Sequence, residues 1–492
     1  MKGSSSLLLA SSTLLSAANG LQLNKRHDPA VVTVNFEKKA RHGSGSLARR
    51  ADDVVGIDVD KHGTHFLYWA NFTIGTPPQN LYAEVDTGSA DLLVLTDEIE
   101  ACKKKDCRGG IFSVSESRTF EWVDSEDEAS GSFGSGESWS GYYANDTFTF
   151  GDVTLDGFQF VSTSAFNSTT SGIFSIFGVG LPRNQHAKNK YPSLPYALRN
   201  AGEINTAAYS LWLDDDQQGR FLFGGVNKAK YSDPLVTFPI PNSEPNLAEK
   251  LLVVLEGFGT TNDGNSTSID FTPRSVLLDS GTVKSRLTQE MVLHILKALD
   301  GVIAESYGAV VPCDLGSKYT LDFTFGELTI SVPLDNFSYR FKYDIGIDGV
   351  SYCRILYKPE ATTIILGDDF LRGAYVVYDY ENMEISLAQY KSDGGKDDIH
   401  EIIKSVPGAS KTNNIPMEFE AYYGSEMGNP TSAPEGIKIA TLTVISSGTG
   451  QPTETGGSKS EDDEYSAAVT SLPRSVTGAI ALGCVAGAFL MW

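Results

Sequence analysis

The sequence predicts a mostly β protein that is built from two related lobes. The composition favours strands and turns, because the chain holds 48 Gly residues and 10% aromatic residues. Apolar and polar residues alternate with a period of two, for example over residues 144–150 and 319–332. One short pattern also occurs twice, as Val-Asp-Thr-Gly-Ser at residues 85–89 and as Leu-Asp-Ser-Gly-Thr at residues 278–282. Each copy follows a strand-like apolar run, so we expect each lobe to present one carboxylate.

Length and charge limit the possible functions. A chain of 492 residues has room for two or three domains and a sizeable core. Its formal net charge of −23 argues against nucleic-acid binding, because contacts with phosphates need a basic face. Two explanations of the acidic balance stay open: a solvated acidic surface and compatibility with an acidic working environment.

The N-terminus has the pattern of a secretory signal peptide over residues 1–18. Lys2 gives a basic start, residues 7–15 an apolar stretch too short to span a bilayer, and residues 16–18 a small-residue cleavage site. Residues 19–50 are basic, poor in core-forming pattern, and end at two arginines. We expect a propeptide whose cations pair with carboxylates of the following domains until the pH falls. A flexible basic arm is the alternative.

Beyond the two Asp motifs, several segments resemble the pepsin-like aspartic proteases. They comprise an entry strand at residues 68–79, paired segments that thread beneath the active-site loops at 176–180 and 364–368, and further pieces at 223–226 and 368–372. The resemblance implies a bilobal pepsin-like fold of two β-barrel-like lobes, with the active site in the cleft between them. We place the lobes at residues 51–235 and 236–390.

The repeated motif predicts an acid–base pair, Asp86 and Asp279. Two carboxylates at close range cannot easily both be ionised, so one pKa falls and the other rises. One group can then take a proton from a water molecule while the other polarises or protonates the peptide carbonyl. The resemblance implies that neighbouring glycines and hydroxyls support these carboxylates, and no cofactor or metal is expected. The supporting residues are Thr87, Gly88, Ser89, Ser280, Gly281 and Thr282.

The predicted flap departs from the family. Its usual pattern is a Tyr followed by Gly-x-Gly on a hairpin that closes over the substrate, and the match here begins at Phe133, with Gly134 and Gly136. The Trp that often bonds the Tyr hydroxyl, seven residues after the first Asp, is Leu93. Because both partners are apolar, neither leaves an unpaired polar group. The lost hydroxyl could weaken substrate alignment.

Glu84 is a second departure, because family members carry an apolar S1-pocket residue at this position. On a strand, residues 84 and 86 point to the same side, so Glu84 should face the cleft near Asp86. A carboxylate there would attract Lys or Arg at P1. The alternative is a Glu that pairs locally or faces solvent. The acidic residues 121–128 could add to the same field or form a solvated loop.

Cysteines and sequons indicate an oxidising, secretory environment. Cys102 and Cys107, and Cys313 and Cys353, match the positions of two disulfides of the family. A metal site at the first pair is the alternative, but no His accompanies it. Cys484 is the odd residue. The five predicted glycosylation sites are Asn71, Asn145, Asn167, Asn265 and Asn336.

Composition changes after residue 390. Residues 398–407 could form a short helix, and residues 391–465 otherwise read as an acidic Ser/Thr/Gly-rich spacer that cannot bury enough apolar surface to fold. The chain ends in an apolar stretch at residues 476–492, preceded by small residues from Ser466. This pattern predicts a glycosylphosphatidylinositol (GPI) anchor signal over residues 466–492, attached at Ser466. A retained transmembrane helix is the alternative.

Together these features resemble the fungal GPI-anchored yapsin-type aspartic proteases. They predict a monomeric, secreted endopeptidase that is anchored at the plasma membrane or cell wall and acts on protein or peptide substrates. A catalytically silent peptide-binding protein of the same fold and a structural wall protein are the alternatives. Peptide cleavage at acid pH would separate both from the enzyme.

Overall fold

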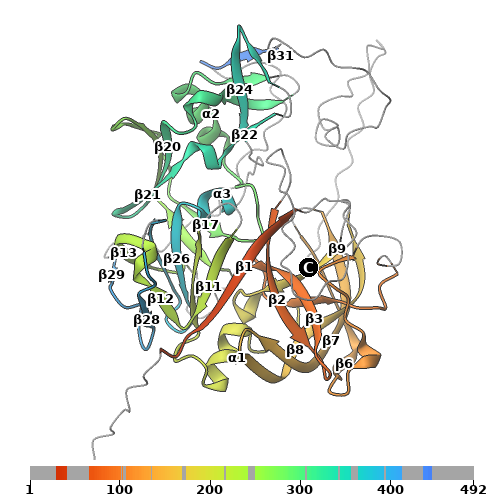
Figure 1. Ribbon diagram of the computed structural model, residues 1–492. Helices are drawn as coiled ribbons and strands as arrows, with labels where there is room; N and C mark the ends of the chain where they lie inside the picture. Colours follow the sequence, from red (N-terminus) through yellow and green to blue (C-terminus); the bar gives the residue numbers. More distant parts are fainter. Residues whose placement is uncertain are drawn as a thin grey trace, which may run out of the picture.

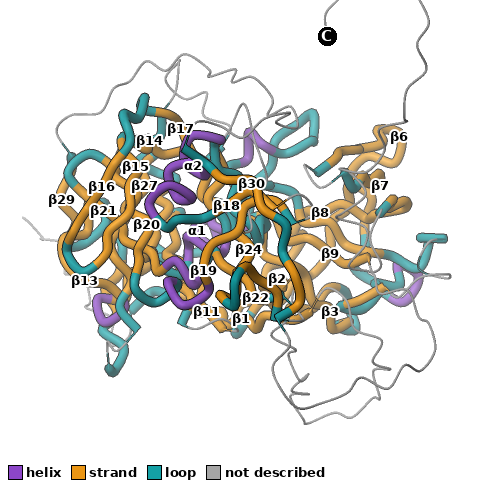
Figure 2. Tube along the Cα trace, turned by 90° about the horizontal axis from the view of Figure 1, so that it is seen from above, coloured by secondary structure: helices purple, strands orange, loops and turns teal. Residues whose placement is uncertain are grey.

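The computed structural model describes residues 29–40, 66–100, 102, 107–133, 136–168, 173–214, 218–241, 250–304, 307–341, 344–355, 364–392, 395–412 and 436–445. These residues are mostly strands and gather into two lobes, as the sequence predicts (Figure 1). The first lobe holds β2 to β9, and the second holds α2 and the strands around β20 and β24. Seen from above, strands dominate both halves of the molecule (Figure 2).

Fifteen described strands form one large sheet. Its order is β29-β13-β27-β26-β10-β11-β1-β2-β3-β9-β4-β8-β7-β6, with β5 paired to β9. The strands are β1 (Val32–Ala40), β2 (Phe66–Ile74), β3 (Gln79–Asp86), β4 (Leu92–Leu95), β5 (Cys107–Arg108), β6 (Glu121–Ser132), β7 (Ser138–Phe150), β8 (Val153–Asn167), β9 (Ile173–Gly178), β10 (Ala208–Leu213), β11 (Gln218–Phe223), β13 (Tyr231–Pro239), β26 (Ala374–Asp379), β27 (Glu384–Tyr390) and β29 (Ala409–Lys411).

The remaining described strands form smaller sheets, most of them in the second lobe. Three strands make one of these sheets: β14 (Leu252–Leu255), β17 (Arg274–Leu278) and β25 (Ile364–Leu366). Four make the next: β15 (Gly257–Asn262), β16 (Asn265–Ser268), β20 (Tyr319–Phe325) and β21 (Leu328–Pro333). Seven make another: β18 (Val302–Ala304), β19 (Gly308–Pro312), β22 (Ser338–Arg340), β23 (Ile345–Ile347), β24 (Val350–Ile355), β30 (Lys438–Ala440) and β31 (Thr443–Val444). The last pair is β12 (Gly225–Asn227) and β28 (Ile399–Glu401).

The helices are short and begin and end at recognisable signals. α2 (Gln289–Ala298) starts where the Thr288 hydroxyl accepts the Met291 N–H at 3.4 Å, and it carries Glu290 in its first turn. α1 (Leu194–Ala201) ends at Gly202, whose φ of 80° suits glycine. A third helix, α3 (Asp368–Leu371), is a single turn after β25.

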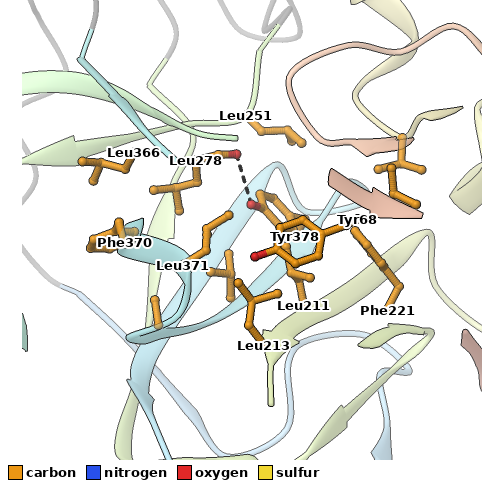
Figure 3. Close-up of a cluster of buried hydrophobic side chains, with 14 of the residues drawn as sticks. Tyr68, Leu211, Leu213, Phe221, Leu251, Leu278, Leu366, Phe370, Leu371 and Tyr378 are labelled. Atoms are coloured by element: carbon orange, nitrogen blue, oxygen red, sulfur yellow. Dashed lines mark hydrogen bonds between the residues drawn. The ribbon is translucent and has the colours of Figure 1, made fainter. Parts of the chain in front are cut away.

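The main apolar core continues through both lobes and supports the ends of the strands that lead to the two Asp motifs. Leu278 of β17 packs in it beside residues of the central strands, and the Tyr378 hydroxyl donates to the Leu278 carbonyl at 3.2 Å (Figure 3). Burying one such side chain contributes about 1.5–3 kcal/mol. This region of the core includes Tyr68, Leu211, Leu213, Phe221, Leu251, Leu366, Phe370 and Leu371.

A second apolar cluster lies on the other face of β3, and we call it the flap-side cluster. Leu81, Ala83 and Val85 of β3 belong to the main core, so the alternate residues of this strand point toward the flap-side cluster. Its buried members are Trp69, Leu93, Leu95, Ile99, Ala129, Trp139, Tyr143, Val161, Phe166, Ile173, Phe174, Ile176, Ala187 and Tyr191.

Part of the predicted propeptide is an integral strand of the large sheet. β1 lies between β11 and β2 and pairs antiparallel with both. Val32, Val34 and Phe36 point inward, and the Phe36 ring lies 4.8 Å from Tyr68 and 5.4 Å from Phe221 between centroids. The expectation that residues 19–50 lack a core-forming pattern is therefore wrong for this strand, whose alternation is short but complete.

Strands also form inside the predicted spacer. β28 pairs with β12, β29 with β13, β30 with β18 and β31 with β23. The unfolded spacer is therefore wrong for residues 395–412 and 436–445, and the helix expected at 398–407 is an extended strand and turns. These strands add to existing edges, and Ile402, Val406 and Ile437 supply buried anchors.

The other domain boundaries stay predictions. Residues 1–28 and 446–492, which hold the signal peptide, Ser466, Cys484 and the anchor signal, lie outside the described residues. Among the helices that the structure describes, none has the length and hydropathy needed to cross a membrane.

Candidate active site

The two predicted carboxylates sit on equivalent loops. Asp86 ends β3 and pairs in parallel register with Gly178 of β9, while β17, which precedes Asp279, runs parallel to β25. The Val179 N–H donates to the Asp86 carbonyl at 2.9 Å, and the Asp279 N–H donates to the Leu366 carbonyl at 3.0 Å. The segments expected to thread beneath the loops therefore do so.

Thr87 and Ser280 lock the two loops to each other. The Thr87 N–H donates to Ser280 Oγ at 3.1 Å, and the Ser280 N–H donates to Thr87 Oγ1 at 2.9 Å. Each hydroxyl in turn donates across the lobe boundary, Thr87 to the Leu278 carbonyl at 2.9 Å and Ser280 to the Val85 carbonyl at 2.7 Å. Sequence reasoning placed both residues in the loops but missed this bond between lobes. The signal was a hydroxyl directly after each Asp.

Each carboxylate accepts the same two donors from its own loop. The pattern is a backbone N–H two residues on and a hydroxyl three residues on, as the resemblance implies. The bonds are Gly88 N–H to Asp86 Oδ1 at 2.7 Å, Ser89 Oγ to Asp86 Oδ2 at 2.5 Å, Gly281 N–H to Asp279 Oδ1 at 2.9 Å, and Thr282 Oγ1 to Asp279 Oδ2 at 2.7 Å. The hydroxyls thereby fix the outer oxygens and leave the inner faces toward each other.

Each glycine touches the opposite carboxylate. A Cβ at Gly88 would lie 2.7 Å from Asp279 Oδ1, and a Cβ at Gly281 would lie 2.6 Å from Asp86 Oδ1. No side chain fits between loops this close, so glycine is required at both positions. The two carboxyl groups are therefore neighbours across the lobe boundary.

Burial and proximity favour a shared proton. Asp86 is 7% exposed and Asp279 is 8% exposed. Burial, and then the charge of Asp279, hold the pKa of Asp86 well above its usual range. A pair that keeps one proton near neutral pH has one group able to accept a proton and one able to donate it.

The predicted flap is a hairpin of β6 and β7. At its tip the Phe133 N–H donates to the Glu137 carbonyl at 2.8 Å, and the Gly136 N–H donates back to the Phe133 carbonyl at 2.9 Å. Gly136 has a φ of 91°, which favours glycine, while Gly134 lies outside the described residues. Phe133 packs on the flap-side cluster, of which Leu93 is a buried member.

Glu84 is buried next to the flap-side cluster. It is 5% exposed, opposite Trp69 on β2 and beside Ile176 on β9. The solvent-facing alternative is therefore wrong. Its alternation with Val85 agrees with a side chain on the same face as Asp86, and its place in an S1 pocket stays a prediction.

The acidic residues 121–128 fall within β6 rather than in a loop. Their pairing with β7 shifts register twice, between Trp122 and Asp124 and between Asp124 and Glu128. Such irregularities let a strand twist away from its partner. Residues 121–128 form a strand, so the alternative that they form a loop is wrong. Glu121 and Glu128 are nevertheless exposed to solvent.

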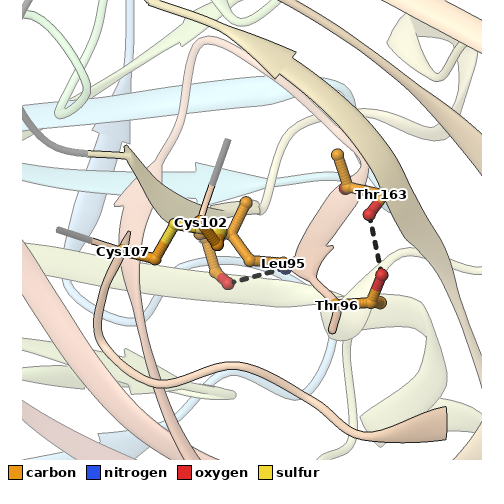
Figure 4. Close-up of a disulfide and its surroundings, with 6 residues drawn as sticks. Leu95, Thr96, Cys102, Cys107 and Thr163 are labelled. Atoms are coloured by element: carbon orange, nitrogen blue, oxygen red, sulfur yellow. Dashed lines mark hydrogen bonds between the residues drawn. A yellow bond between two sulfur atoms is a disulfide. The ribbon is translucent and has the colours of Figure 1, made fainter. Parts of the chain in front are cut away.

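Both predicted disulfides are present. Cys102 and Cys107 have Cα atoms 5.2 Å apart, and Cys313 and Cys353 have Cα atoms 4.9 Å apart. Figure 4 shows the first beside β4, whose Leu95 N–H donates to Ser175 Oγ at 3.1 Å. The metal alternative at this pair is wrong. Within the described ranges, no group of three or more His, Cys, Asp or Glu is placed to hold a metal ion.

The predicted glycosylation sites differ in exposure. Asn71, Asn167 and Asn265 are exposed, while Asn145 and Asn336 are half-buried. The Asn336 side-chain amide donates to the Asp369 carbonyl at 3.2 Å, a bond that a glycan would disturb. Glycosylation itself stays a prediction at all five positions.

Comparison with known proteins agrees with this geometry. The family model described as eukaryotic aspartyl protease matches residues 67–390. The chain is 33% identical over 476 residues to the probable aspartic-type endopeptidase OPSB of Arthroderma benhamiae, covering 89% of this chain and 94% of the relative. It is 34% identical over 453 residues to the probable aspartic-type endopeptidase opsB of Aspergillus fumigatus, covering 87% and 90%. It is 31% identical over 445 residues to aspartic proteinase yapsin-3 of Saccharomyces cerevisiae, covering 86% and 83%. The chain thus belongs to the eukaryotic aspartyl protease family and is an aspartic-type endopeptidase, a hydrolase that acts on peptide bonds.

Proposed function

We propose that the protein is a secreted, surface-anchored endopeptidase in which Asp86 and Asp279 activate one water molecule. The observation that carries this proposal is the paired hydrogen-bonding of the two loops, which aims both carboxyls at one point. Ser89 and Thr282 hold the outer oxygens, so the inner oxygens face the reacting water. The hydrogen bonds between and within the two loops hold both carboxyls in position, which lowers the cost of reaching the transition state.

The chemistry then needs only the shared proton. The ionised carboxyl takes a proton from water as the hydroxide adds to the peptide carbonyl carbon. The protonated carboxyl gives its proton to the carbonyl oxygen, which leaves a tetrahedral gem-diol. The first group then protonates the leaving nitrogen as the C–N bond breaks, and a hydroxyl of the gem-diol returns a proton to the second carboxyl as the product acid forms. Water and one peptide bond become one acid and one amine, and the pair regains its starting protonation.

Replacing either carboxyl by its amide tests this mechanism. Asp86→Asn and Asp279→Asn should each abolish cleavage of a casein-type substrate at acid pH, because each removes one member of the pair. The matched control is Asp156→Asn, an exposed Asp on β8, which creates no glycosylation sequon and should retain wild-type turnover. Near-normal turnover by either purified dyad variant would refute the assignment.

We also propose a preference for basic P1 residues through Glu84. Support comes from its low exposure and from Trp69 and Ile176, its neighbours on the adjacent strands. In such apolar surroundings, a carboxylate and a substrate cation interact more strongly than in water. The acidic residues 121–128 of β6 are the second candidate for the same preference.

The route to the cell surface rests on sequence patterns at both ends. A signal peptide, a propeptide removed after Arg50 and an anchor signal at residues 466–492 would deliver the enzyme to the outer face of the membrane or the wall. The two disulfides support an oxidising compartment.

An inactive peptide-binding protein is the weaker candidate. It rests on Phe133 in the flap, whereas both carboxyls and their donors are complete.

A further inference from the structure

We propose that Asp91 and His186 form a fixed platform on which the flap hairpin docks, and that His186 and Trp139 are positioning residues for enclosing the substrate. This inference rests on the proposed endopeptidase mechanism, because a flap matters only where a peptide is held over the Asp pair. The platform lies beside the catalytic loop, five residues after Asp86.

Asp91 is the hub of the platform. Its side chain is 4% exposed. Oδ1 accepts the hydroxyls of Tyr143 at 3.2 Å and Tyr191 at 2.8 Å. Oδ2 accepts the backbone N–H of His186 at 2.8 Å and lies 3.1 Å from His186 Nδ1. A buried carboxylate with four donors is held in one orientation, and it holds its donors in return.

His186 presents its ring to both strands of the hairpin. Trp139 of β7 meets the imidazole edge to face, with ring centroids 5.1 Å apart and an interplanar angle of 84°. Gly131 of β6 lies against both rings, since a Cβ there would sit 2.8 Å from His186 Nε2 and 2.9 Å from the Trp139 ring. Gly131 and Trp139 are direct cross-strand partners. A side chain at residue 131 would therefore collide with both rings, so glycine is what lets β6 lie against the imidazole.

Two points on β7 are tied to the same carboxylate. Trp139 reaches Asp91 through His186, and Tyr143 bonds Asp91 directly. These residues are four apart on one strand, so they lie on the same face. These two contacts fix both the distance of the hairpin from the platform and its tilt, whereas a single contact would leave the tilt free. At the tip, Phe133 contributes apolar packing on the flap-side cluster.

The platform should affect substrate binding more than chemistry. The Asp pair is held by its own loops, independently of the hairpin. A hairpin that is fixed over the cleft excludes water and pins the substrate main chain, so loosening it should raise KM more than it lowers kcat.

The test compares His186→Ala and His186→Phe in the full chain. The alanine variant should fold, because Asp91 keeps its two tyrosine donors and the backbone N–H of residue 186. The matched control is His294→Ala in the second lobe, whose ring lies 6.0 Å from Phe258 at 76°. Hydrogen exchange of the hairpin's backbone amides measures the docking directly. The kinetics of peptide hydrolysis measure its effect on KM.

We expect His186→Ala to speed amide exchange across β6 and β7 about fivefold or more and to raise KM by a similar factor, with kcat within about twofold. His186→Phe keeps a ring against Trp139 and should recover most of the protection. Unchanged hairpin exchange in His186→Ala, equal loosening in His294→Ala, or no recovery with phenylalanine would overturn the platform. An unchanged KM beside a loosened hairpin would overturn the positioning role. Because exchange needs no turnover, failure of the endopeptidase mechanism would be seen separately, as an inactive wild type.

Discussion

At the scale of single residues, the active site depends on a proton that burial keeps on the Asp pair. The pKa of Asp86 is raised from 3.8 to about 8, first by burial and then by the charge of Asp279. The folded state therefore binds this proton more tightly than the unfolded chain. Its stabilising contribution is complete below about pH 4 and is lost as the pH rises through about 8.

This linkage predicts a pH-dependent difference between wild type and Asp86→Asn. The amide has no charge to desolvate, so the variant should gain melting temperature relative to wild type as the pH rises from about 4 to about 8. Thermal unfolding at a series of pH values measures the difference. The control is Asp156→Asn, which removes an exposed carboxyl and buries none, and a flat difference for Asp86→Asn would contradict the raised pKa.

Glu84 gives the second prediction at this scale. If it lines S1, Glu84→Leu should shift P1 preference from basic to apolar residues by about tenfold or more, since a shielded charge-assisted contact contributes about 1.5–3 kcal/mol. Glu84→Gln keeps the shape and should lose the basic preference without gaining the apolar one. Peptide-library profiling measures the P1 preference of each variant. An unchanged profile in both Glu84 variants, together with a lost basic preference in Glu128→Gln, would assign the preference to β6.

At the scale of elements, β1 makes part of the predicted propeptide a structural strand of the central sheet. The Phe36 ring fills a slot where a Cβ at Gly219 would lie 2.2 Å from it. Phe36→Ala should therefore destabilise the unprocessed chain by about 3–5 kcal/mol. Denaturant unfolding in an Asp86→Asn background, which prevents self-cleavage, measures it. Thr33→Ala, exposed on the same strand, is the control, and equal stability of the two variants would contradict an anchoring role.

The features that the sequence predicts at this scale are those whose interacting residues lie close together along the chain. The two Asp loops, the flap turn at Phe133 and the disulfide of Cys102 and Cys107 are local patterns, and the structure contains all three. β28 to β31 are two or three residues long, and β1 pairs with β11 far along the chain, so the residues of these strands carry little signal of their pairing. The cross-lobe bonds of Thr87 and Ser280, and the Asp91 platform, likewise need the tertiary fold to bring their partners together.

At the scale of the whole molecule, the described strands of the enzyme continue to β31, farther toward the C-terminus than composition suggests. β30 and β31 return to the second lobe after the segment that follows β29. Deleting residues 476–492 removes none of these strands, so the enzyme should stay folded and active while it passes into the medium. A phosphatidylinositol-specific phospholipase should release the anchored protein made from the undeleted chain in the same way.

Fractionation of cells and medium, with activity measured in both, checks this prediction. Retention of the deleted form on membranes would show that the attachment lies elsewhere in the chain. A truncation that also removes residues 436–445 is a useful comparison, because it strips strands from the second lobe and should lower its melting temperature.

Because of the position of β1, activation depends on how fast this strand leaves the sheet after cleavage. Ladder hydrogen bonds hold this strand on both sides, to β11 and to β2. A cut after Arg50 severs the peptide link and leaves those bonds intact, so the freed peptide stays seated as a tightly bound fragment. It can depart only when the sheet opens locally, and that opening sets the lag between nicking and full maturation. Freshly nicked enzyme should therefore carry a small peptide through gel filtration, and release it in denaturant.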